Sequence, residues 1–472
     1  MSIETVKNDQ QNMQAPANAA IGERRIHGSL RVGTAAYFGA FFVLSFASAF
    51  LLYLDHEKAG FTLLFLTWAI IPVLAATDRV RFDGKRLIRD GIVPRIWRIL
   101  NRSRYWLRLS DVEQVDTQTV RSLRRGGRVM YRYSTTFRGK GTVITLTSGG
   151  EAYRRMVRNV LPSVPAEVMD GRSLELRDYL LTLSDLRVKA MSSEIPSVDV
   201  LESSVRKRLL RRKNDLGGKP SDPEKASHLR RLANELRLSG SLPQSLEAFR
   251  RAALAAPPDG WLLLEFSRCL QAFATVERDD RVFRRSQAMM RLAERRAGTD
   301  ADLLARIGET YVQVGDWRRA ARVFRHSTEI VGETFLALRG LAEVALREGK
   351  IAHVIHNFAA ANRLATLPSL QRWTRGEVEY FSRINSDDEY MELEVSRVNL
   401  LDSVDRWQRR FFLTSMIGFP AILVGLLIDA ATVTNIGWSV SLISLTGWLL
   451  TGFGKRMLEQ RIPFEALSAD DS

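Results

Sequence analysis

Four long apolar blocks, two near each end of the chain, constrain its fold more than any other feature of the sequence. The first covers residues 32–54 without a charged residue, which exceeds the roughly 20 apolar residues that cross a bilayer as a helix. The second covers residues 61–76 and contains Pro72, which a membrane helix tolerates when neighbouring groups satisfy the freed backbone carbonyl. These two blocks predict a transmembrane hairpin over residues 32–76.

A matching pair of apolar blocks lies at the other end, over residues 411–428 and 436–453, joined by the sequence DAATVTN. It predicts a second transmembrane hairpin over residues 411–453. Each block also has a simpler explanation as a buried core helix of a globular protein, and that alternative stays open. The fold class that we expect is a multi-domain integral membrane protein with four transmembrane helices in two hairpins.

Lys and Arg residues flank these blocks unevenly, and this bias predicts the orientation, because cytoplasmic flanks of membrane helices are enriched in positive charge. Lys58 is the only Lys or Arg residue in the turns inside the two hairpins, whereas every outer flank carries several Lys or Arg residues. We therefore expect both termini and the whole central region on the cytoplasmic side. Residues 1–31 are expected to form a retained, disordered N-terminal tail, and residues 454–472 a C-terminal tail.

Short β-like runs follow the first hairpin, namely VRF, RLIRDGIV, RYWLRL, RVMYRYSTTF and GTVITLT. The period then changes to that of a helix, with one apolar face made by Tyr153, Met156, Val157, Val160 and Leu161. A membrane hairpin followed by FDGKRLIRDGIV, a basic WLRLSDVEQV segment, further strands and a closing helix resembles the bacterial pleckstrin-homology-like (PH-like) domain. The resemblance implies a small mainly-β domain over residues 77–165 and a location in the bacterial inner (cytoplasmic) membrane.

The strand-rich part is strongly basic. Residues 78–158 carry 20 Lys and Arg against 7 Asp and Glu, a net charge of +13 within a chain of net charge +16. Each basic residue near an anionic leaflet contributes on the order of 1 kcal/mol to membrane binding. Five arginines across a predicted hairpin are therefore candidates for contacts with lipid headgroups: Arg121, Arg124, Arg125, Arg128 and Arg132. A solvated hairpin explains them equally well, and nucleic-acid binding is a third interpretation, although no recognised nucleic-acid module is present.

Residues 166–225 read as a helical connector and linker. Their basic run, residues 206–213, follows a helical stretch and precedes the turn-rich sequence GGKPSDPEK, which marks a domain boundary. We interpret this run as a solvated helix, because its apolar face is too thin for a membrane-surface helix.

An internal repeat of 34 residues begins after this linker and is the strongest signal in the helical part. In LLARIGETYVQVGDWRRAARVF, the small residues Gly308 and Ala320 and the aromatic residues Tyr311 and Phe324 have a spacing that resembles the tetratricopeptide repeat (TPR). Small residues let paired helices approach, and aromatic residues fill the gap between them. A step of 34 residues from Phe324 reaches Phe358, so the pattern recurs.

The resemblance implies an all-α TPR-like solenoid over residues 226–367. Its first unit departs from the pattern by Ser245 at the twentieth place. The next unit, residues 260–300, is seven residues longer than the period, and we expect the extra residues around positions 274–281. Two further helices over residues 368–410 are expected to cap the solenoid and lead into the third apolar block.

A TPR-like solenoid implies a concave surface, lined by the first helix of each repeat, that binds a protein partner. The candidate groove residues are Arg230, Asn234, Arg237, Trp261, Leu264, Arg268, Gln271, Arg306, Glu309, Gln313, Arg339, Glu343 and Arg347. Arginines predominate, which favours an acidic or amphipathic segment as the ligand. Arg230, Asn234 and Arg306 also stand where some family members hold the terminal carboxylate of a peptide, although Glu265 replaces an Asn of that clamp. Internal carboxylates provide a structural explanation for the same arginines.

The sequence contains no pattern that predicts catalysis, and we expect no enzyme, no cofactor and no metal site. It has no GxxxxGK[ST] loop, no GxSxG elbow and no HExxH motif. His353 and His356 are three residues apart on a predicted helix, but no carboxylate pair completes a ligand set, and surface or packing histidines are favoured. The single cysteine, Cys269, excludes an intramolecular disulfide and predicts a small buried residue.

Two classes of function follow from these features. The first is a membrane-anchored TPR adaptor or scaffold that binds a protein partner on the cytoplasmic side, for example as an accessory or assembly subunit of an inner-membrane complex. The alternative is an anionic-lipid-sensing or envelope-homeostasis protein in which the basic PH-like domain binds the lipid.

Overall fold

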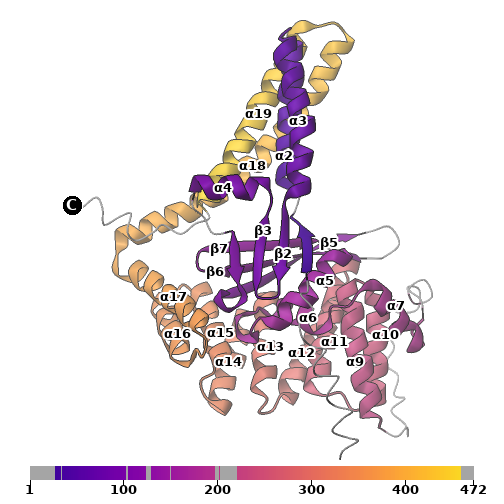
Figure 1. The fold of residues 1–472 in the computed structure, drawn as a ribbon. Coiled ribbons are helices and arrows are strands. Elements are labelled where there is room, and N and C mark those ends of the chain that lie inside the picture. Colours follow the sequence, from indigo (N-terminus) through magenta and orange to yellow (C-terminus); the bar gives the residue numbers. More distant parts are fainter. Residues whose placement is uncertain are drawn as a thin grey trace, which may run out of the picture. The chain divides into compact units, whose positions relative to one another are not determined.

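The computed structural model of the protein describes residues 27–32, 35–101, 105–123, 129–148, 150–196, 201 and 221–458. These residues are mostly helical, with two small antiparallel sheets near the N-terminus (Figure 1). The chain divides into two compact units. The first contains both sheets and the helices from α4 to α14. The second contains α2, α3, α16, α18 and α19, and the helices α15 and α17 cross the boundary.

Four short strands form the first sheet in the order β1-β2-β3-β4, and every neighbouring pair is antiparallel. They are β1 (His27–Arg31), β2 (Arg79–Asp83), β3 (Arg86–Asp90) and β4 (Trp106–Arg108). The strand β1 corrects the predicted tail, whose last five residues are ordered by pairing with β2. The physical reason is burial of apolar side chains, since Leu30 on β1 and Val80 and Phe82 on β2 are all buried.

The helix α4 (Ile92–Asn101) stands where the sequence predicted the end of a strand. The strand β3 ends at Asp90, and Gly91 has a φ of 154°, a conformation that favours glycine. A Cβ at Gly91 would lie 2.9 Å from the Cα of Asp78. The close backbone approach therefore ends the strand, and the segment that follows is helical.

The second sheet has three antiparallel strands, β5 (Gln114–Leu123), β6 (Val129–Gly139) and β7 (Thr142–Ser148). The helix α5 (Glu151–Val160) follows it. All five residues predicted on the apolar face of this helix are buried, which confirms the change of period. Of the five headgroup candidates, Arg124, Arg125 and Arg128 lie outside the described residues, Arg121 lies on β5, and Arg132 on β6 is exposed.

Two connector helices and a run of helical pairs complete the first unit and continue into the second. Their bounds are α6 (Gly171–Tyr179), α7 (Leu183–Ser192), α9 (Pro223–Ser239), α10 (Leu242–Ala255), α11 (Gly260–Glu277), α12 (Asp280–Arg296), α13 (Ala301–Val314), α14 (Trp317–Val331), α15 (Phe335–Arg347), α16 (Ile351–Leu364) and α17 (Pro368–Ser386). Consecutive helices pack as pairs, as expected for TPR-like repeats. The extra residues of the second repeat lengthen α11 and α12 to 18 and 17 residues, compared with 14 and 15 in α13 and α14.

The small and aromatic residues of the repeat pattern pack as expected. The ring of Phe324 lies against Gly308, where a Cβ would be 2.5 Å from the ring, and also against Gly340. A side chain larger than hydrogen at either glycine would displace this ring. In the first repeat, the hydroxyl of Ser245 donates a hydrogen bond of 2.7 Å to the carbonyl of Ala233, so its polar group is satisfied in the core.

The single cysteine is a core residue, as predicted. Cys269 is fully buried, and its Sγ lies 3.1 Å from the Oγ of Ser245. Burial raises the pKa of the Cys269 thiol to about 11. The thiol is therefore protonated at neutral pH and packs as a small apolar group.

Four helices of the second unit carry the apolar blocks: α2 (Ala35–Tyr53), α3 (Glu57–Thr77), α18 (Asp388–Leu427) and α19 (Ala431–Leu458). Three of them, α3, α18 and α19, are long and apolar enough to cross a membrane. The described apolar stretch of α2 is Tyr37–Tyr53, so a span formed by the first block stays a prediction. The helix α3 begins at Glu57, inside the predicted polar turn, and is longer than the second block of the sequence.

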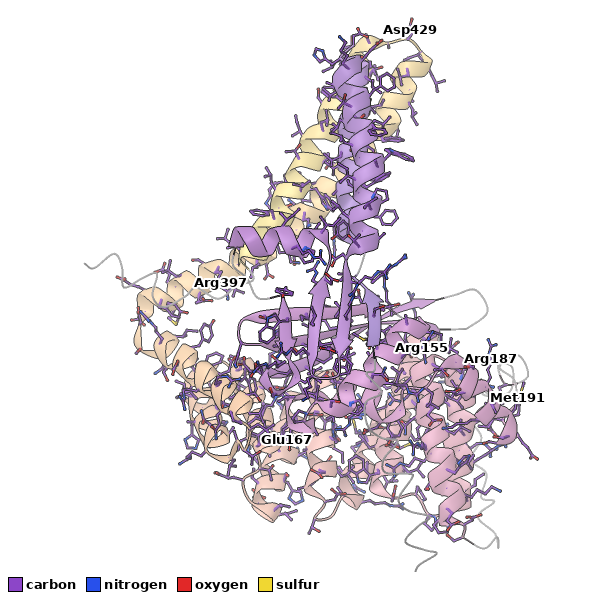
Figure 2. The ribbon with its side chains drawn as sticks, in the orientation of Figure 1. Arg155, Glu167, Arg187, Met191, Arg397 and Asp429 are labelled. Carbon is purple, nitrogen blue, oxygen red and sulfur yellow. The ribbon has the colours of Figure 1, made fainter. Side chains whose placement is uncertain are left out.

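The capping segment and the third block form one helix rather than two. The 40 residues of α18 run without a break from Asp388, and a short turn that contains Asp429 leads to α19 (Figure 2). Glycines bring α18 and α19 together, since a Cβ at Gly425 would lie 2.6 Å from the backbone nitrogen of Thr434. In the same unit, Trp438 of α19 packs on Phe46 of α2 with ring centroids 4.7 Å apart.

Candidate functional site

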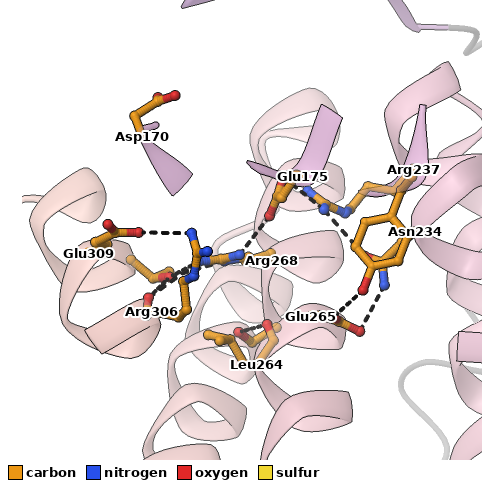
Figure 3. A network of polar contacts seen from close by, with 12 residues as sticks. Asp170, Glu175, Asn234, Arg237, Leu264, Glu265, Arg268, Arg306 and Glu309 are labelled. Atoms are coloured by element: carbon orange, nitrogen blue, oxygen red, sulfur yellow. Dashed lines mark hydrogen bonds and ion pairs between the residues drawn. The ribbon is translucent and has the colours of Figure 1, made fainter. Parts of the chain in front are cut away.

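The predicted groove is formed in the first unit by α9, α11 and α13, the first helices of three successive repeats. We call the side of these helices that carries Arg230, Arg237, Arg268 and Arg306 the first-helix face. It is occupied by another part of the same chain, because the connector helix α6 packs on it (Figure 3). At the start of α6, a Cβ on Gly171 would lie 2.6 Å from the carboxylate of Glu309 on α13, so the two helices approach closely.

Glu175 of α6 bridges two arginines of the first-helix face. Its carboxylate oxygens lie 2.9 Å from Nη2 of Arg237 and 2.6 Å from Nη1 of Arg268. The three side chains are only 10 to 14% exposed. Burial alone would raise the pKa of the Glu175 carboxyl, but the guanidinium groups of Arg237 and Arg268 outweigh it and hold this pKa below its usual range. The ion pairs are therefore intact at neutral pH.

Arg268 is held by further hydrogen bonds that fix its orientation. Its Nε and Nη2 donate to the hydroxyl of Thr310 at 3.0 and 2.7 Å, and Nη2 also donates to the carbonyl of Arg306 at 3.3 Å. Thr310 in turn donates to the same carbonyl at 2.7 Å. Arg268 thus connects α6, α11 and α13.

The carboxylate of Glu265, on α11, binds two of the residues that the sequence placed in a carboxylate clamp. Arg230 donates to its two oxygens at 2.6 and 3.1 Å, and the amide of Asn234 donates to it at 2.8 Å. The hydroxyl of Tyr179, at the end of α6, donates to it at 3.0 Å. An internal carboxylate therefore takes the place of a peptide carboxylate, while Arg306 lies 3.5 Å from Glu309.

The opposite side of α6 is fastened to the second sheet. The hydroxyl of Ser173 lies 2.8 Å from that of Thr117, which lies 3.0 Å from that of Thr135, which lies 2.7 Å from the hydroxyl of Tyr153. All four residues are buried. Because buried hydroxyls are costly unless they are bonded, this chain of contacts holds α6 between the sheet and the repeats.

Asp170 caps the start of α6. Its carboxylate accepts a hydrogen bond of 2.8 Å from the backbone N–H of Ser173. Burial raises the pKa of Asp170 to about 6, and the hydrogen bonds from Ser173 only partly oppose this shift. The cap therefore titrates within the range of pH that a cell experiences.

A cavity of about 220 Å³ remains where the sheet, α6 and the first-helix face meet. The residues that line it include Arg172, Glu175, Arg237, Arg268, Gln271 and Gln313. The predicted groove residues Gln271 and Gln313 thus do border a space, but one that α6 partly fills.

The other predicted groove residues have varied surroundings. Leu264 is fully buried and belongs to the core, and the indole N–H of Trp261 donates a hydrogen bond of 2.9 Å to Asp300. Arg339, Glu343 and Arg347 lie on α15, at the boundary between the two units.

The sequence did not identify Glu175 and Tyr179 as residues of this site. The available signal was the excess of arginines on one predicted surface, because carboxylates must compensate that positive charge.

In the part of the chain that the structure describes, no group of three or more His, Cys, Asp and Glu side chains is arranged to hold a metal ion. His353 and His356 are both exposed on α16.

No protein-family model matches the chain. No curated protein matches it either. Among solved structures, it is similar to a chain in the crystal structure of the APC/C hetero-tetramer Cut9–Hcn1, at 13% identity and a TM-score of 0.28. The match covers 65% of this chain and 52%, about half, of that chain. A similarity at this TM-score does not identify the fold, so the assignment of TPR-like pairs rests on the helix packing described above.

Proposed function

We propose that the protein is a membrane-anchored scaffold that binds a protein partner on the cytoplasmic side through its TPR-like repeats. The observation that carries this proposal is the docking of α6. The first-helix face holds a helix of the same chain by pairing its Glu175 with Arg237 and Arg268 at 2.9 and 2.6 Å. The same surface therefore has the chemistry to hold a helical segment of a partner that presents a carboxylate, and α6 is its occupant in this conformation.

The membrane anchoring is supported by three helices that are long and apolar enough to span a bilayer. The positive flanks of the apolar blocks support a cytoplasmic location of the repeats. A scaffold needs neither a catalytic constellation nor a cofactor, and the PH-like resemblance of the strand-rich part is compatible with a role next to the membrane.

A partner that competes for the first-helix face must displace α6. Displacement of α6 removes Glu175 from Arg237 and Arg268. A segment that buries these arginines again must supply a carboxylate, because unpaired buried charges are costly. A competing segment should therefore present a Glu or Asp side chain. The affinity of the partner is reduced by the cost of opening α6, so weakening the α6 contact should strengthen binding.

Affinity purification of the full chain in mild detergent from its native membrane tests this function. We expect a protein partner in stoichiometric amount, and more of it with the variant Glu175→Gln, whose α6 is held less tightly. The control is Asp178→Asn, which alters an exposed carboxylate of α6 that pairs with its neighbour Arg177. Anionic lipid without any stoichiometric protein would instead favour the lipid-sensing function of the basic domain.

A further inference from the structure

The helix α4 has an apolar side that the first unit leaves uncovered. Its sequence, IVPRIWRILN, places Ile92, Val93 and Ile96 within an arc of about 100° on a helix of 3.6 residues per turn. Ile92 is 40% exposed and Ile96 52% exposed. Together they form a small exposed apolar strip on this helix, which could contact an apolar surface.

The start of α4 is fixed beside the end of a candidate membrane span. The helix α3 ends at Thr77, and a Cβ on Gly91 would lie 3.1 Å from the carbonyl oxygen of Thr77. Arg89, two residues before Gly91, pairs with both carboxylate oxygens of Asp78 at 3.1 and 2.7 Å. α4 therefore begins at the point where the chain leaves α3.

The same point receives the other helix of the hairpin. The backbone N–H of Val32 donates a hydrogen bond of 3.1 Å to the carbonyl of Asp78, and α2 begins only three residues later, at Ala35. The chain thus enters and leaves the first apolar hairpin beside the start of α4. If the hairpin spans the membrane, this point lies at the level of the headgroups.

The charge of this segment is suited to an anionic surface. Residues 92–104 contain four arginines and no acidic residue. The side chain of Arg95 is 73% exposed, and its ion pair with Asp90 is the exposed kind that contributes little to stability. Apolar residues on one side and arginines elsewhere are the features of helices that lie flat in a membrane interface.

We propose that α4 lies flat in the cytoplasmic interface of the membrane, with Ile92 and Ile96 at the boundary of the acyl chains and its arginines against anionic phosphate groups. This inference rests on the membrane anchoring proposed above. It differs from the headgroup candidates of the sequence, of which the described ones, Arg121 and Arg132, lie on β5 and β6 and not on α4.

The test uses the full chain, reconstituted into vesicles of phosphatidylcholine and phosphatidylglycerol. Since Cys269 is the only native cysteine, a Cys269→Ala chain accepts single reporter cysteines. Ile96→Cys is labelled with a small fluorophore and quenched by lipids with a spin label near the headgroup. Three matched positions are Arg95→Cys on the same helix, Phe65→Cys on α3, which is 72% exposed, and Val143→Cys on β7, which is 60% exposed.

The proposal predicts that the labels at positions 96 and 95, both at the level of the interface, lose most of their fluorescence, while the label at position 143 loses little. The label at position 65 should be quenched by spin labels deep in the acyl chains. An unquenched label at 96 together with a quenched label at 65 would overturn the proposal for α4 and leave the anchoring intact, as when a protein covers this helix. Absence of quenching at both positions would contradict the anchoring itself.

A second arm tests the lipid class. Vesicles of phosphatidylcholine alone should reduce the quenching at position 96, because the arginines lose their anionic partners. Equal quenching in neutral and anionic vesicles would contradict the part of the proposal that assigns anionic headgroups.

Discussion

The helices α4 and α6 are both short, and both belong to the first unit, but α6 is packed between other elements whereas α4 has exposed side chains. α6 is held on one side by hydroxyls of the second sheet and on the other by arginines of the repeats. α4 has exposed isoleucines and an exposed Arg95. The comparison teaches that arginines alone do not identify a binding surface. The nearly buried pairs of Arg237 and Arg268 with Glu175 hold the fold together, whereas the exposed pair of Arg95 with Asp90 contributes little and leaves Arg95 accessible.

The largest effect that we expect comes from removing the bridge on α6. Glu175→Gln leaves two nearly buried guanidinium groups without their carboxylate, which should lower the free energy of opening of α6 by about 3 kcal/mol. Hydrogen exchange of the α6 amides in the detergent-solubilised chain measures this free energy. Asp178→Asn is the matched control and should change it by less than about 0.5 kcal/mol. Equal protection in both variants would mean that Glu175 does not hold α6.

A smaller effect should follow from the titration of Asp170. Its pKa is about 6 in the folded protein, above the value of about 3.9 expected for an unfolded chain, so the folded state binds the proton more tightly. This contribution to stability is complete below pH 4 and is lost as the pH rises towards 6, on the order of 2 kcal/mol in total. The pKa of the Glu175 carboxyl is shifted in the other direction, below its usual range, so its titration would give a pH dependence of the opposite sign.

Hydrogen exchange of α6 between pH 4 and 7, corrected for the intrinsic rate, should therefore show decreasing protection. Asp170→Asn keeps an acceptor for the cap but cannot titrate, and it should remove the pH dependence. A wild-type profile that is flat, or that rises with pH, would show that the burial of Asp170 does not control its charge.

A still smaller effect, at the C-terminal end of α6, is expected from Tyr179→Phe. The hydroxyl of Tyr179 donates to Glu265 at 3.0 Å, and its removal should cost about 1 kcal/mol of α6 protection. Glu265 keeps its bonds from Arg230 and Asn234, so the repeats should be unaffected. Loss of protection in α9 or α11 as well would indicate that Tyr179 supports the repeats and not only α6.

The smallest effect is expected on α4. Ile96→Ser removes an apolar side chain that is 52% exposed, and it should change the stability of the solubilised chain by less than about 0.5 kcal/mol. Thermal unfolding monitored at the second sheet would measure it. A large loss of stability would mean that Ile96 packs inside the protein and would remove the contrast with α6.

Periodicity in the sequence predicted most of the helical pairs and the buried face of α5, because apolar spacing reports directly on which side of a helix is buried. Periodicity failed where contact with backbone that is far away in the sequence determines the secondary structure. The strand β1 depends on pairing with β2 across an intervening helical hairpin, and Gly91 ends β3 through contact with Asp78. Neither interaction has a local signature in the sequence.

The candidate site was predicted in part for the same reason. The arginines of the first helices follow from the repeat spacing, but Glu175 lies 62 residues before Arg237 and has no periodic relation to it. Sequence patterns placed the positive charges on one surface, and only the fold shows that the compensating carboxylate comes from the connector.

The central claim is that α6 is held on the first-helix face by the pairing of Glu175 with the arginines. A double-mutant cycle of Glu175→Gln and Arg268→Gln, read from the hydrogen exchange of α6 amides in the full chain, tests it most directly. We predict a coupling energy above about 1 kcal/mol, because Glu175→Gln leaves the nearly buried Arg268 without its carboxylate, while Arg268→Gln leaves Glu175 with only one of its two arginines. Additive effects, with a coupling energy near zero, would contradict the claim that this ion pair fastens α6 to the repeats.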